Sequence, residues 1–490
     1  MAGPVLSLQR CTAISVHWAK AMIVRLLNGS FYCSLVVFSA PNQHHSAGDR
    51  IPLNKQPYNL DHHWMPYTGN RAFKLKPRMI VGAKGNYFQS DDGRQVFDSL
   101  SGLWCCGAGH SVTAIADAIG KQLQTNDFSP GFQFGHPLSF ELAEKICEFM
   151  PAGLNRVMFT NSGSESADTS LKIARAYWQR RGLPTKTKLI GRGKGYHGVN
   201  FGGMSVGGIE VNKSLFGAGL DTDHLASTLL PENTFCAGMP QYGEHLANEL
   251  EQKIALHGAS TIAAVIVEPL SGSGGVVVPP VGYLQRLSEI CKQHDILLIF
   301  DEVITGFGRC GANTGAEAFG VVPDIINLAK QLTNGVIPMG AVVVREEIYN
   351  RFMETPAPPH AVEFPHGYTY SGHPVACAAA LATLKHIQEA AHVDRVQQLA
   401  PVLQRHIHGL RAMPHVSDIR NFGLTGAIAL EGRDGDATVR PYEAGVALWE
   451  AGFYVRWGGD TLQFGPPFTT TEAELERLFS TVADVLETLV

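Results

Sequence analysis

The stretch ILLIFDEVITGFGR, residues 296–309, places five apolar residues directly before two carboxylates, Asp301 and Glu302. A continuous apolar run of this length is typical of a strand that is buried on both faces. An acid at the end of such a strand must be solvated, paired or used chemically, because an isolated buried carboxylate is costly. The stretch therefore predicts a buried strand whose last residue needs a partner.

Similar apolar runs flank this stretch, and together they predict the fold class. They are NRVMFT, TKLIG, TIAAVIVEP, DIINLAK and GAVVV, between residues 155 and 344. Amphipathic, helix-like segments separate several of them, which indicates a mostly parallel sheet with helices on both faces. From about residue 395 short strands alternate with helices, so the sequence predicts an α/β protein with a large domain and a smaller α+β domain.

Composition bounds the possible functions. The 490 residues carry a formal net charge of −5 and 45% hydrophobic residues, which is typical of a soluble globular protein and gives no indication of a nucleic-acid partner. The nine cysteines are scattered and lack metal-like spacing. This pattern favours reduced structural thiols in a cytoplasmic compartment, without a metal site.

Residues 1–48 differ from the rest of the chain, since they contain basic residues but no acid before Asp49. An acid-free basic head resembles a targeting segment, so that possibility stays open. Lys20 and Arg25 interrupt its apolar runs, which argues against a membrane span. We favour a disordered or non-native extension and exclude this segment from the fold.

Two glycine-containing loops are candidate anion sites. Ser162-Gly163-Ser164 follows an apparent strand and opens a helix, which suits a phosphate, although an ordinary serine-capped turn is the more frequent explanation. Residues 193–198 match G-x-G-x-x-G, the dinucleotide-binding turn of nicotinamide oxidoreductases. Neither the required helix nor the strand-terminal acid follows, so we treat this match as accidental. Tyr196 and His197 in that loop are equally consistent with packing and with a ligand contact.

Lys330 follows another apolar strand, 29 residues after Asp301. A lysine in such a place is desolvated, which lowers its pKa and makes the free amine a nucleophile. Asp301 needs a cationic partner, and a protonated pyridine nitrogen would be one. Pyridoxal phosphate needs a lysine, an acid on the ring nitrogen and a phosphate cradle, so these features together indicate that cofactor.

The sequence also resembles a known family. LLIFDEVITGFGR, followed by INLAKQLTNG, looks like the signature of class III aminotransferases, and the likeness extends over roughly residues 55–490. SLSGLWCCGAGHS, HGYTYSGHPVACAAA and YVRWGGDTLQFGPPF resemble the omega-amino acid–pyruvate (beta-alanine–pyruvate) transaminases in particular. The resemblance implies fold type I and pyridoxal 5′-phosphate. It also implies transfer of the amino group of an omega-amino acid to pyruvate, which gives malonate semialdehyde and alanine.

The resemblance implies roles for individual residues. Lys330 binds the cofactor covalently and acts as general base, and Asp301 holds the pyridinium. The remaining cofactor contacts fall on Ser162, Gly163, Ser164, Tyr196, His197, Glu268, Val303 and Thr369. Thr369 would reach the phosphate of a neighbouring subunit, which implies a homo-oligomer with shared active sites.

The resemblance also assigns two residues to the substrate. Arg456 ends a short apolar run and would clamp the substrate carboxylate, although a surface pair with Asp460 or Glu443 is the alternative. Trp104 would form a wall of the substrate pocket, where a packing role is the alternative.

The predicted organisation has four parts: the extension 1–48, a segment 49–100 that contributes to the small domain, the large cofactor domain 101–375 and the small domain 376–490. The alternative functions are a taurine–pyruvate or other amine–pyruvate transaminase and an aminomutase. A nicotinamide oxidoreductase is the remote alternative.

Overall fold

The computed structural model describes residues 24–27, 30–33, 58–217 and 219–489. The chain divides into two compact units, Met1–Pro77 and Arg78–Val490. In the first unit, β1 (Val24–Leu27) pairs antiparallel with β2 (Ser30–Cys33), and α1 spans Asn70–Leu75. The prediction for residues 1–48 otherwise lies outside the described residues.

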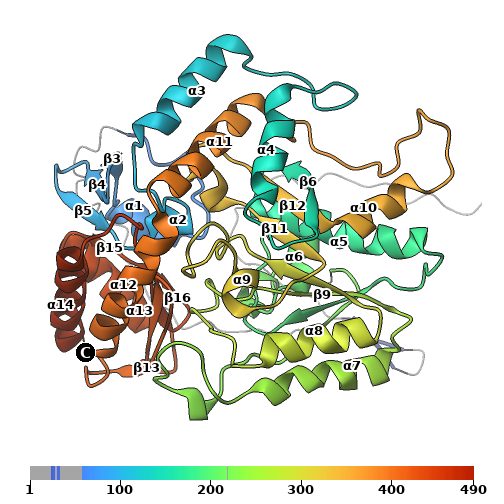
Figure 1. The fold of residues 1–490 in the computed structure, drawn as a ribbon. Helices are drawn as coiled ribbons and strands as arrows, with labels where there is room; N and C mark the ends of the chain where they lie inside the picture. The colour runs from blue at the N-terminus through green and yellow to red at the C-terminus, as the bar shows by residue number, and fades with distance from the viewer. Residues whose placement is uncertain (1–23, 28–29, 34–57, 218, 490) are drawn as a thin grey trace, which may run out of the picture. The chain divides into compact units, whose positions relative to one another are not determined.

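The second unit is built around a seven-stranded sheet of order β6-β12-β11-β10-β9-β7-β8 (Figure 1). Its strands are β6 (Leu154–Thr160), β7 (Lys188–Arg192), β8 (Thr222–Leu225), β9 (Ile262–Val267), β10 (Leu297–Asp301), β11 (Ile325–Leu328) and β12 (Gly340–Arg345). Strands β7 to β11 run parallel, whereas β12 is antiparallel to both β11 and β6. The mostly parallel sheet is therefore confirmed.

Helices cover both faces of this sheet, because successive residues of its strands point to opposite sides. Phe300 and Leu298 of β10 pack in one core cluster with residues of α7 (Glu249–His257) and α8 (Tyr283–Gln293). Ile299 and Leu297 join the opposite cluster, with α5 (Gly163–Arg180) and α10 (Glu346–Met353). A strand buried on both sides has room for a polar residue only at its end, which is where Asp301 lies.

Two smaller sheets complete the second unit. One has the order β13-β14-β17-β16, with β13 (Val416–Phe422), β14 (Thr425–Leu430), β16 (Arg456–Gly458) and β17 (Thr461–Phe464). The other has the order β15-β5-β4-β3, with β3 (Ile80–Lys84), β4 (Tyr87–Ser90), β5 (Gln95–Asp98) and β15 (Phe453–Tyr454). Chain segments more than 350 residues apart therefore share a sheet.

The helices around these sheets are as follows. They are α2 (Ser101–Trp104), α3 (Thr113–Thr125), α4 (Pro137–Cys147), α6 (Phe201–Val206), α9 (Gly315–Phe319), α11 (Pro374–Glu389), α12 (His392–His408), α13 (Val439–Glu450) and α14 (Glu472–Thr488). In Figure 1, α11 runs from the region of α3 and α4 towards α12 and the small sheets. The domain boundaries at residues 48, 100 and 375 stay predictions.

The sequence missed β8, whose residues TDHL carry little apolar character, and it did not reveal the reversed direction of β12. Among the described residues, no helix is long and apolar enough to cross a membrane. The described part of the chain also holds no cluster of three His, Cys, Asp or Glu residues that could bind a metal ion.

Candidate active site

Asp301 is the last residue of β10 and is 5% exposed. His197 Nδ1 lies 2.8 Å from Asp301 Oδ2, and the Val303 amide donates to Oδ1 at 3.2 Å. The other ring nitrogen of His197, Nε2, is buried and has no hydrogen-bond partner. Asp301 is therefore oriented by protein groups and still has capacity to accept a further donor.

Glu302, the next residue, serves the fold instead. It is 1% exposed, and its carboxylate accepts hydrogen bonds from the amides of Gly315 and Ala316 and from Thr305 Oγ1. These groups lie at the start of α9 and in the preceding turn. Burial raises the pKa of Glu302 to about 7, although the three donors oppose the shift. Of the two acids in the opening stretch, Asp301 is bonded to His197 of the loop after β7, whereas Glu302 is bonded to the start of α9 and to Thr305.

Glu268 follows β9 directly and is also buried. Its Oε1 accepts the Tyr196 amide at 2.8 Å, so it fixes the loop that carries Tyr196 and His197. Burial raises the pKa of Glu268 to about 7, and the nearby charge of Asp301 acts in the same direction, whereas His197 opposes it. The strand ends of β9 and β10 and the loop after β7 thus meet at one place.

Lys330 lies two residues beyond β11, at the start of a short 3-10 helix (Lys330–Thr333). Its φ is 49°, a left-handed conformation that costs a non-glycine residue roughly 1–3 kcal/mol. Burial lowers the pKa of Lys330, and the positive charge of Arg456 lowers it further, while Cys105, Asp301 and Glu268 oppose this shift. A lysine with a lowered pKa has a larger fraction of the free amine.

Two residues that the sequence analysis did not select hold the Lys330 turn. Gln331 Oε1 accepts the Gly107 amide at 2.7 Å, and Asn334 Oδ1 accepts the Ala108 amide at 3.0 Å. Asn334 Nδ2 also donates to the Gly109 carbonyl at 2.8 Å. Their place in the QLTN segment directly after Lys330 was the only available signal, because their partners lie more than 200 residues away.

The start of α5 forms a cradle for an anion. Ser162 caps the helix by accepting the Glu165 amide, and the amides of the first helical residues, Gly163 and Ser164, have no partner within a helix. A Cβ added to Gly163 would lie 2.9 Å from Val303 Cγ1, and one added to Gly198 would lie 2.6 Å from Ser164 Cα. Both glycines therefore permit close backbone approach, and Val303 packs directly beside the cradle.

Trp104 is buried against Gly465, at which an added Cβ would lie 2.5 Å from Trp104 Cε3. The guanidinium of the buried Arg309 lies 5.8 Å from the Trp104 ring centroid, close enough for a cation–π contact. Trp104 Nε1 is buried without a hydrogen-bond partner. The Trp104 ring thus fills space in the core, and its Nε1–H group remains a hydrogen-bond donor without a protein acceptor.

Arg456 begins β16 and is half-buried. Its Nε is buried without a hydrogen-bond partner, and no ion pair within the described part of the chain involves it. Glu443, one of the expected surface partners, pairs with Arg433 instead, at 2.5 Å. The second expected partner, Asp460, forms no ion pair in this described region either. Arg456 therefore carries an uncompensated charge, which is near enough to Lys330 to shift its pKa.

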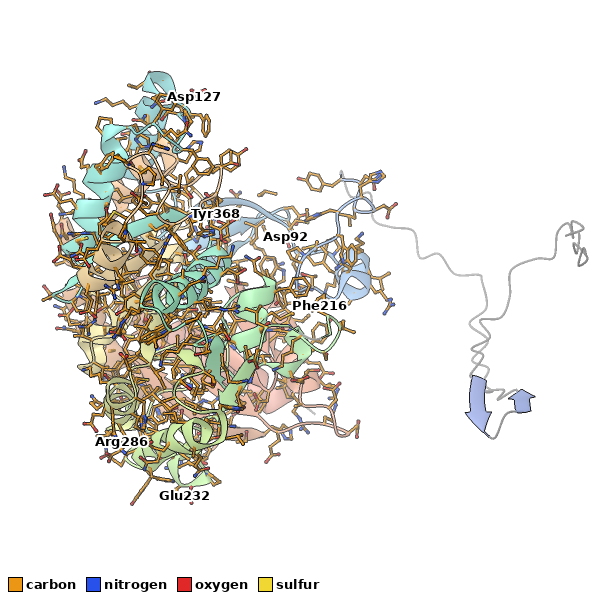
Figure 2. All side chains as sticks on the ribbon, turned by 90° about the vertical axis from the view of Figure 1, so that its right-hand side faces the viewer. Asp92, Asp127, Phe216, Glu232, Arg286 and Tyr368 are labelled. Carbon is orange, nitrogen blue, oxygen red and sulfur yellow. The ribbon has the colours of Figure 1, made fainter. Side chains whose placement is uncertain are left out.

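Thr369 lies apart from these residues and is exposed. It follows Tyr368, labelled in Figure 2, whose hydroxyl lies 3.3 Å from Thr169 Oγ1 on α5. The ring of His366 lies 2.9 Å from the same Thr169 hydroxyl. The segment before Thr369 is thus held against α5, while Thr369 itself faces outwards.

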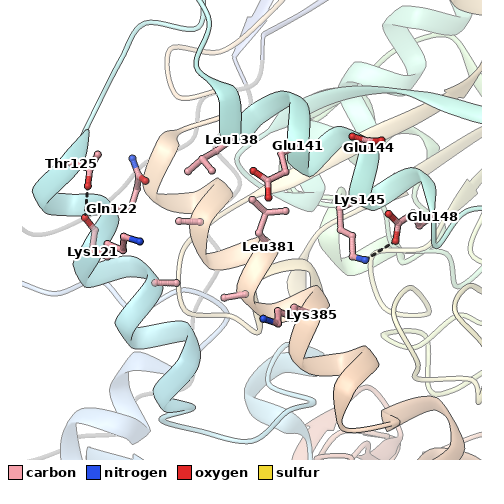
Figure 3. A pocket seen from close by; sticks show the side chains of 13 residues that line it. Lys121, Gln122, Thr125, Leu138, Glu141, Glu144, Lys145, Glu148, Leu381 and Lys385 are labelled. Atoms are coloured by element: carbon pink, nitrogen blue, oxygen red, sulfur yellow. Dashed lines mark hydrogen bonds and ion pairs between the residues drawn. The ribbon is translucent and has the colours of Figure 1, made fainter.

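A cavity of about 590 Å³ lies elsewhere, between α3, α4 and α11 (Figure 3). Charged residues surround it, including Lys121, Glu141 and Lys385, and Lys145 pairs with Glu148 at its edge. None of the predicted site residues lines this cavity. The chemistry is concentrated at the carboxyl edge of the seven-stranded sheet, as expected for ligands of open α/β sheets.

Comparison with known proteins agrees with this geometry. The model of the family "Aminotransferase class-III" matches residues 69–486. The chain is 60% identical over 441 residues to the beta-alanine–pyruvate aminotransferase of Pseudomonas aeruginosa, covering 89% of this chain and 98% of that protein. It is also 60% identical over 432 residues to the omega-amino acid–pyruvate aminotransferase of Pseudomonas putida, covering 88% of this chain and 96% of that protein.

Solved structures are similar as well. An (S)-enantioselective omega-transaminase from Thermomicrobium roseum superposes with a TM-score of 0.82 at 33% identity, covering 87% of this chain and 96% of that one. An amine transaminase from an uncultivated Pseudomonas species, in its PLP-bound form, gives a TM-score of 0.80 at 35% identity, with coverages of 87% and 98%. The chain belongs to the class III aminotransferases. The predicted family and the fold-type-I α/β architecture are thereby confirmed.

Its cofactor is pyridoxal 5′-phosphate, in agreement with the prediction. The residues present fit this group. The α5 cradle and its close-packed glycines suit a phosphate, Asp301 suits a cationic ring nitrogen, and Lys330 suits an aldehyde. The G-x-G-x-x-G match at residues 193–198 instead supplies the Tyr196–His197 loop, which Glu268 and Asp301 hold in place.

Proposed function

We propose that this aminotransferase transfers the amino group of β-alanine to pyruvate, which yields malonate semialdehyde and alanine. The single observation that carries the proposal is Arg456, an unpaired guanidinium near Lys330 that is free to bind a carboxylate. β-Alanine and pyruvate both carry a carboxylate group. The names of the two relatives at 60% identity support the same pair of substrates.

Lys330 carries the proton in this mechanism. Bound pyridoxal phosphate supplies an electron sink for the carbon that bears the nitrogen. Lys330 lies two residues beyond β11, and burial lowers its pKa, so its free amine can take a proton from C3 of β-alanine. In the second half of the cycle the same group returns a proton to C2 of the product alanine. One buried lysine therefore serves both halves of the reaction.

The remaining residues bind and orient. Ser162, Gly163 and Ser164, at the start of α5, would hold the phosphate. Asp301, fixed by His197, would keep the ring nitrogen protonated. Val303 and Tyr196 would contact the ring. Glu268 stabilises the loop that carries Tyr196.

Arg456 fixes the position of the reacting carbon. A bidentate contact to the carboxylate holds β-alanine in one orientation, and pyruvate then uses the same contact. Trp104 forms the adjacent wall. Since the carboxylate is the one group that both substrates share, one arginine suffices for the two half-reactions.

We further propose a homo-oligomer in which Thr369 contacts the cofactor phosphate of a neighbouring subunit. Its exposure in the isolated chain and the anchoring of the preceding segment on α5 support this role. A cytoplasmic location is supported by the seven cysteines from Cys105 onwards in the described chain, all of which are free thiols.

The test is an absorbance spectrum of the purified holoenzyme during sequential addition of substrates. We expect the cofactor band to fall when β-alanine is added and to return with pyruvate, with malonate semialdehyde and alanine as the products. A band that ignores β-alanine but falls with taurine or another amine would reassign the donor. Isomerisation of the donor without any need for pyruvate would identify an aminomutase and overturn the proposal.

A further inference from the structure

Arg456 has a neighbour in the small sheet that also lacks a partner. In the antiparallel pair β16–β17, Arg456 lies directly opposite Gln463. Directly opposed residues of an antiparallel pair place their side chains on the same face of the sheet. Gln463 is fully buried, and its side-chain oxygen, Oε1, has no hydrogen-bond partner. Arg456 Nε is a buried donor in the same condition.

The face that carries both residues points away from the core of the small domain. Leu462 and Phe464, which alternate with Gln463 along β17, pack into that core. Gln463 instead donates through Nε2 to the carbonyl of Ser273, in the loop that follows Glu268. Gln463 therefore contacts the segment of the large sheet's edge that begins with Glu268, five residues before Ser273.

The hydrogen bonds of Gln463 determine which way its amide points. Nε2 lies 3.3 Å from the Ser273 carbonyl and 3.3 Å from Thr461 Oγ1. A carbonyl can only accept, and the Thr461 hydroxyl already donates to the Gly458 carbonyl at 3.0 Å. Both neighbours thus require a donor, so the nitrogen faces them and Oε1 faces away. The unpartnered oxygen is a consequence of this arrangement.

We propose that Gln463 is a positioning residue for Arg456, and that its Oε1 accepts the Nε–H of Arg456 when the guanidinium binds a carboxylate. This proposal rests on the function proposed above and deepens it. With Nε held by Gln463, both terminal nitrogens of the guanidinium face the substrate, which is the geometry of a bidentate contact. A neutral amide holds the donor without cancelling the positive charge that attracts the substrate.

Arg420 lies on the same face of the small sheet, and its neighbour is a carboxylate rather than an amide. Arg420 and Gln463 both lie opposite Ala427, on β13 and β17 respectively. Arg420 forms an ion pair with Asp418 and donates through Nε to the Gly275 carbonyl at 2.8 Å. Its charge is therefore used within the protein, whereas a glutamine at position 463 leaves that of Arg456 available.

The experiment measures the first half-reaction of Gln463→Met and Gln463→Glu with β-alanine and with propylamine, which lacks the carboxylate. Gln463→Met removes the acceptor at similar volume, so we expect the apparent affinity for β-alanine to fall about 3- to 10-fold, with little change for propylamine. Gln463→Glu neutralises Arg456, so the β-alanine effect should exceed 10-fold. Gln404 is a half-buried glutamine of α12, so Gln404→Met is the matched control. It should leave the apparent affinity for both amines unchanged.

A double-mutant cycle provides the decisive readout. In an Arg456→Ala background the Nε donor is gone, so Gln463→Met should have no further effect on β-alanine. Additive effects, or equal losses with β-alanine and propylamine, would overturn the positioning role and indicate a general packing defect. Failure of the wild-type enzyme to react with β-alanine would overturn the proposed function instead, so the two failures are distinguishable.

Discussion

The acids on the cofactor side of the candidate site are held by hydrogen bonds, whereas the arginine and the glutamine on its substrate side keep unpartnered polar atoms. On the cofactor side, at the carboxyl edge of the seven-stranded sheet, Asp301 and Glu268 both accept hydrogen bonds from the loop after β7. On the substrate side, in the small sheet, Arg456 and Gln463 each retain a buried polar atom without a partner. The polar groups around one permanent ligand can be fixed by hydrogen bonds within the protein, whereas a site for two alternating substrates must keep polar groups that only the substrates bind.

The largest effect is expected on the cofactor side. Replacing Lys330 with alanine removes the proton-transferring amine, so kcat should fall at least ~10⁴-fold. Steady-state turnover of β-alanine and pyruvate is the measurement. Lys330→Arg is the matched control, because it keeps a cation but not a titratable amine, and it should be equally inactive. Substantial turnover by either variant would remove Lys330 from the mechanism.

The second prediction separates the two adjacent acids. Asp301→Asn removes the charge that holds the ring nitrogen protonated, so kcat should fall about 10²- to 10³-fold with the fold intact. The matched variant Glu302→Gln should retain turnover and instead lower the thermal midpoint by roughly 2–5 °C, because the carboxylate bonds only α9 and its preceding turn. Equal losses of turnover would show that the difference between the acids is not functional.

The third prediction concerns the substrate side. Arg456→Ala should lower kcat/KM for β-alanine about 10- to 10²-fold, since a charged hydrogen-bonding partner is lost, with little change for propylamine. Arg420→Ala is the control, because its charge is already paired with Asp418. It should reduce stability without this substrate discrimination. Equal effects of Arg456→Ala on both amines would exclude a carboxylate contact.

The cofactor side could largely be predicted from the sequence, for a physical reason. Asp301 and Lys330 each follow a continuous apolar run, and the ends of parallel strands meet at one edge of a sheet. Local pattern and general sheet geometry were therefore sufficient to bring them together. The apolar pattern did not reveal the direction of β12, because an antiparallel strand in a buried sheet has the same apolar pattern as a parallel one.

The substrate side could be predicted only in part. Arg456 was selected through family resemblance, but Gln463 was not, because its role depends on the β16–β17 register and on Ser273, 190 residues earlier in the chain. The alternative pairing of Arg456 with Asp460 or Glu443 depends on the three-dimensional structure, which pairs Glu443 with Arg433 instead. The sequence did not predict the role of Gln331 and Asn334 for the same reason, since their hydrogen-bond partners lie more than 200 residues away.

A fourth prediction tests the cradle on the cofactor side. Gly198→Ala should weaken pyridoxal phosphate binding about 10-fold or more, because the new Cβ would lie 2.6 Å from Ser164 Cα at a φ of 92°. Gly153→Ala is an unusually close control, since Gly153 has a φ of 90° and open space around its Cβ position. Titration of both apoproteins with the cofactor is the measurement. Similar affinities in the two variants would show that the clash with Ser164 does not weaken cofactor binding.

The smallest effect concerns the pH dependence of stability on the cofactor side. Burial raises the pKa of Glu268 from 4.5 to about 7, so the folded apoprotein binds more protons than the unfolded chain between these values. The contribution of Glu268 to the free energy of unfolding is then fully present below pH 4.5 and is lost as pH rises through 7, by ~3 kcal/mol for this group.

The variant Glu268→Gln cannot titrate, so the fall in thermal midpoint from pH 5 to pH 8 should be smaller in that variant. Glu302→Gln should flatten the same profile, since its pKa is also about 7. Asp92→Asn is the control, because hydrogen bonds from Ser90 and Arg94 lower the pKa of that exposed acid to about 2, so it titrates below the measured range and its loss should leave the slope unchanged. An unchanged slope in Glu268→Gln would mean that the Tyr196 amide keeps Glu268 ionised throughout this pH range, and that the hydrogen bond outweighs burial at this acid.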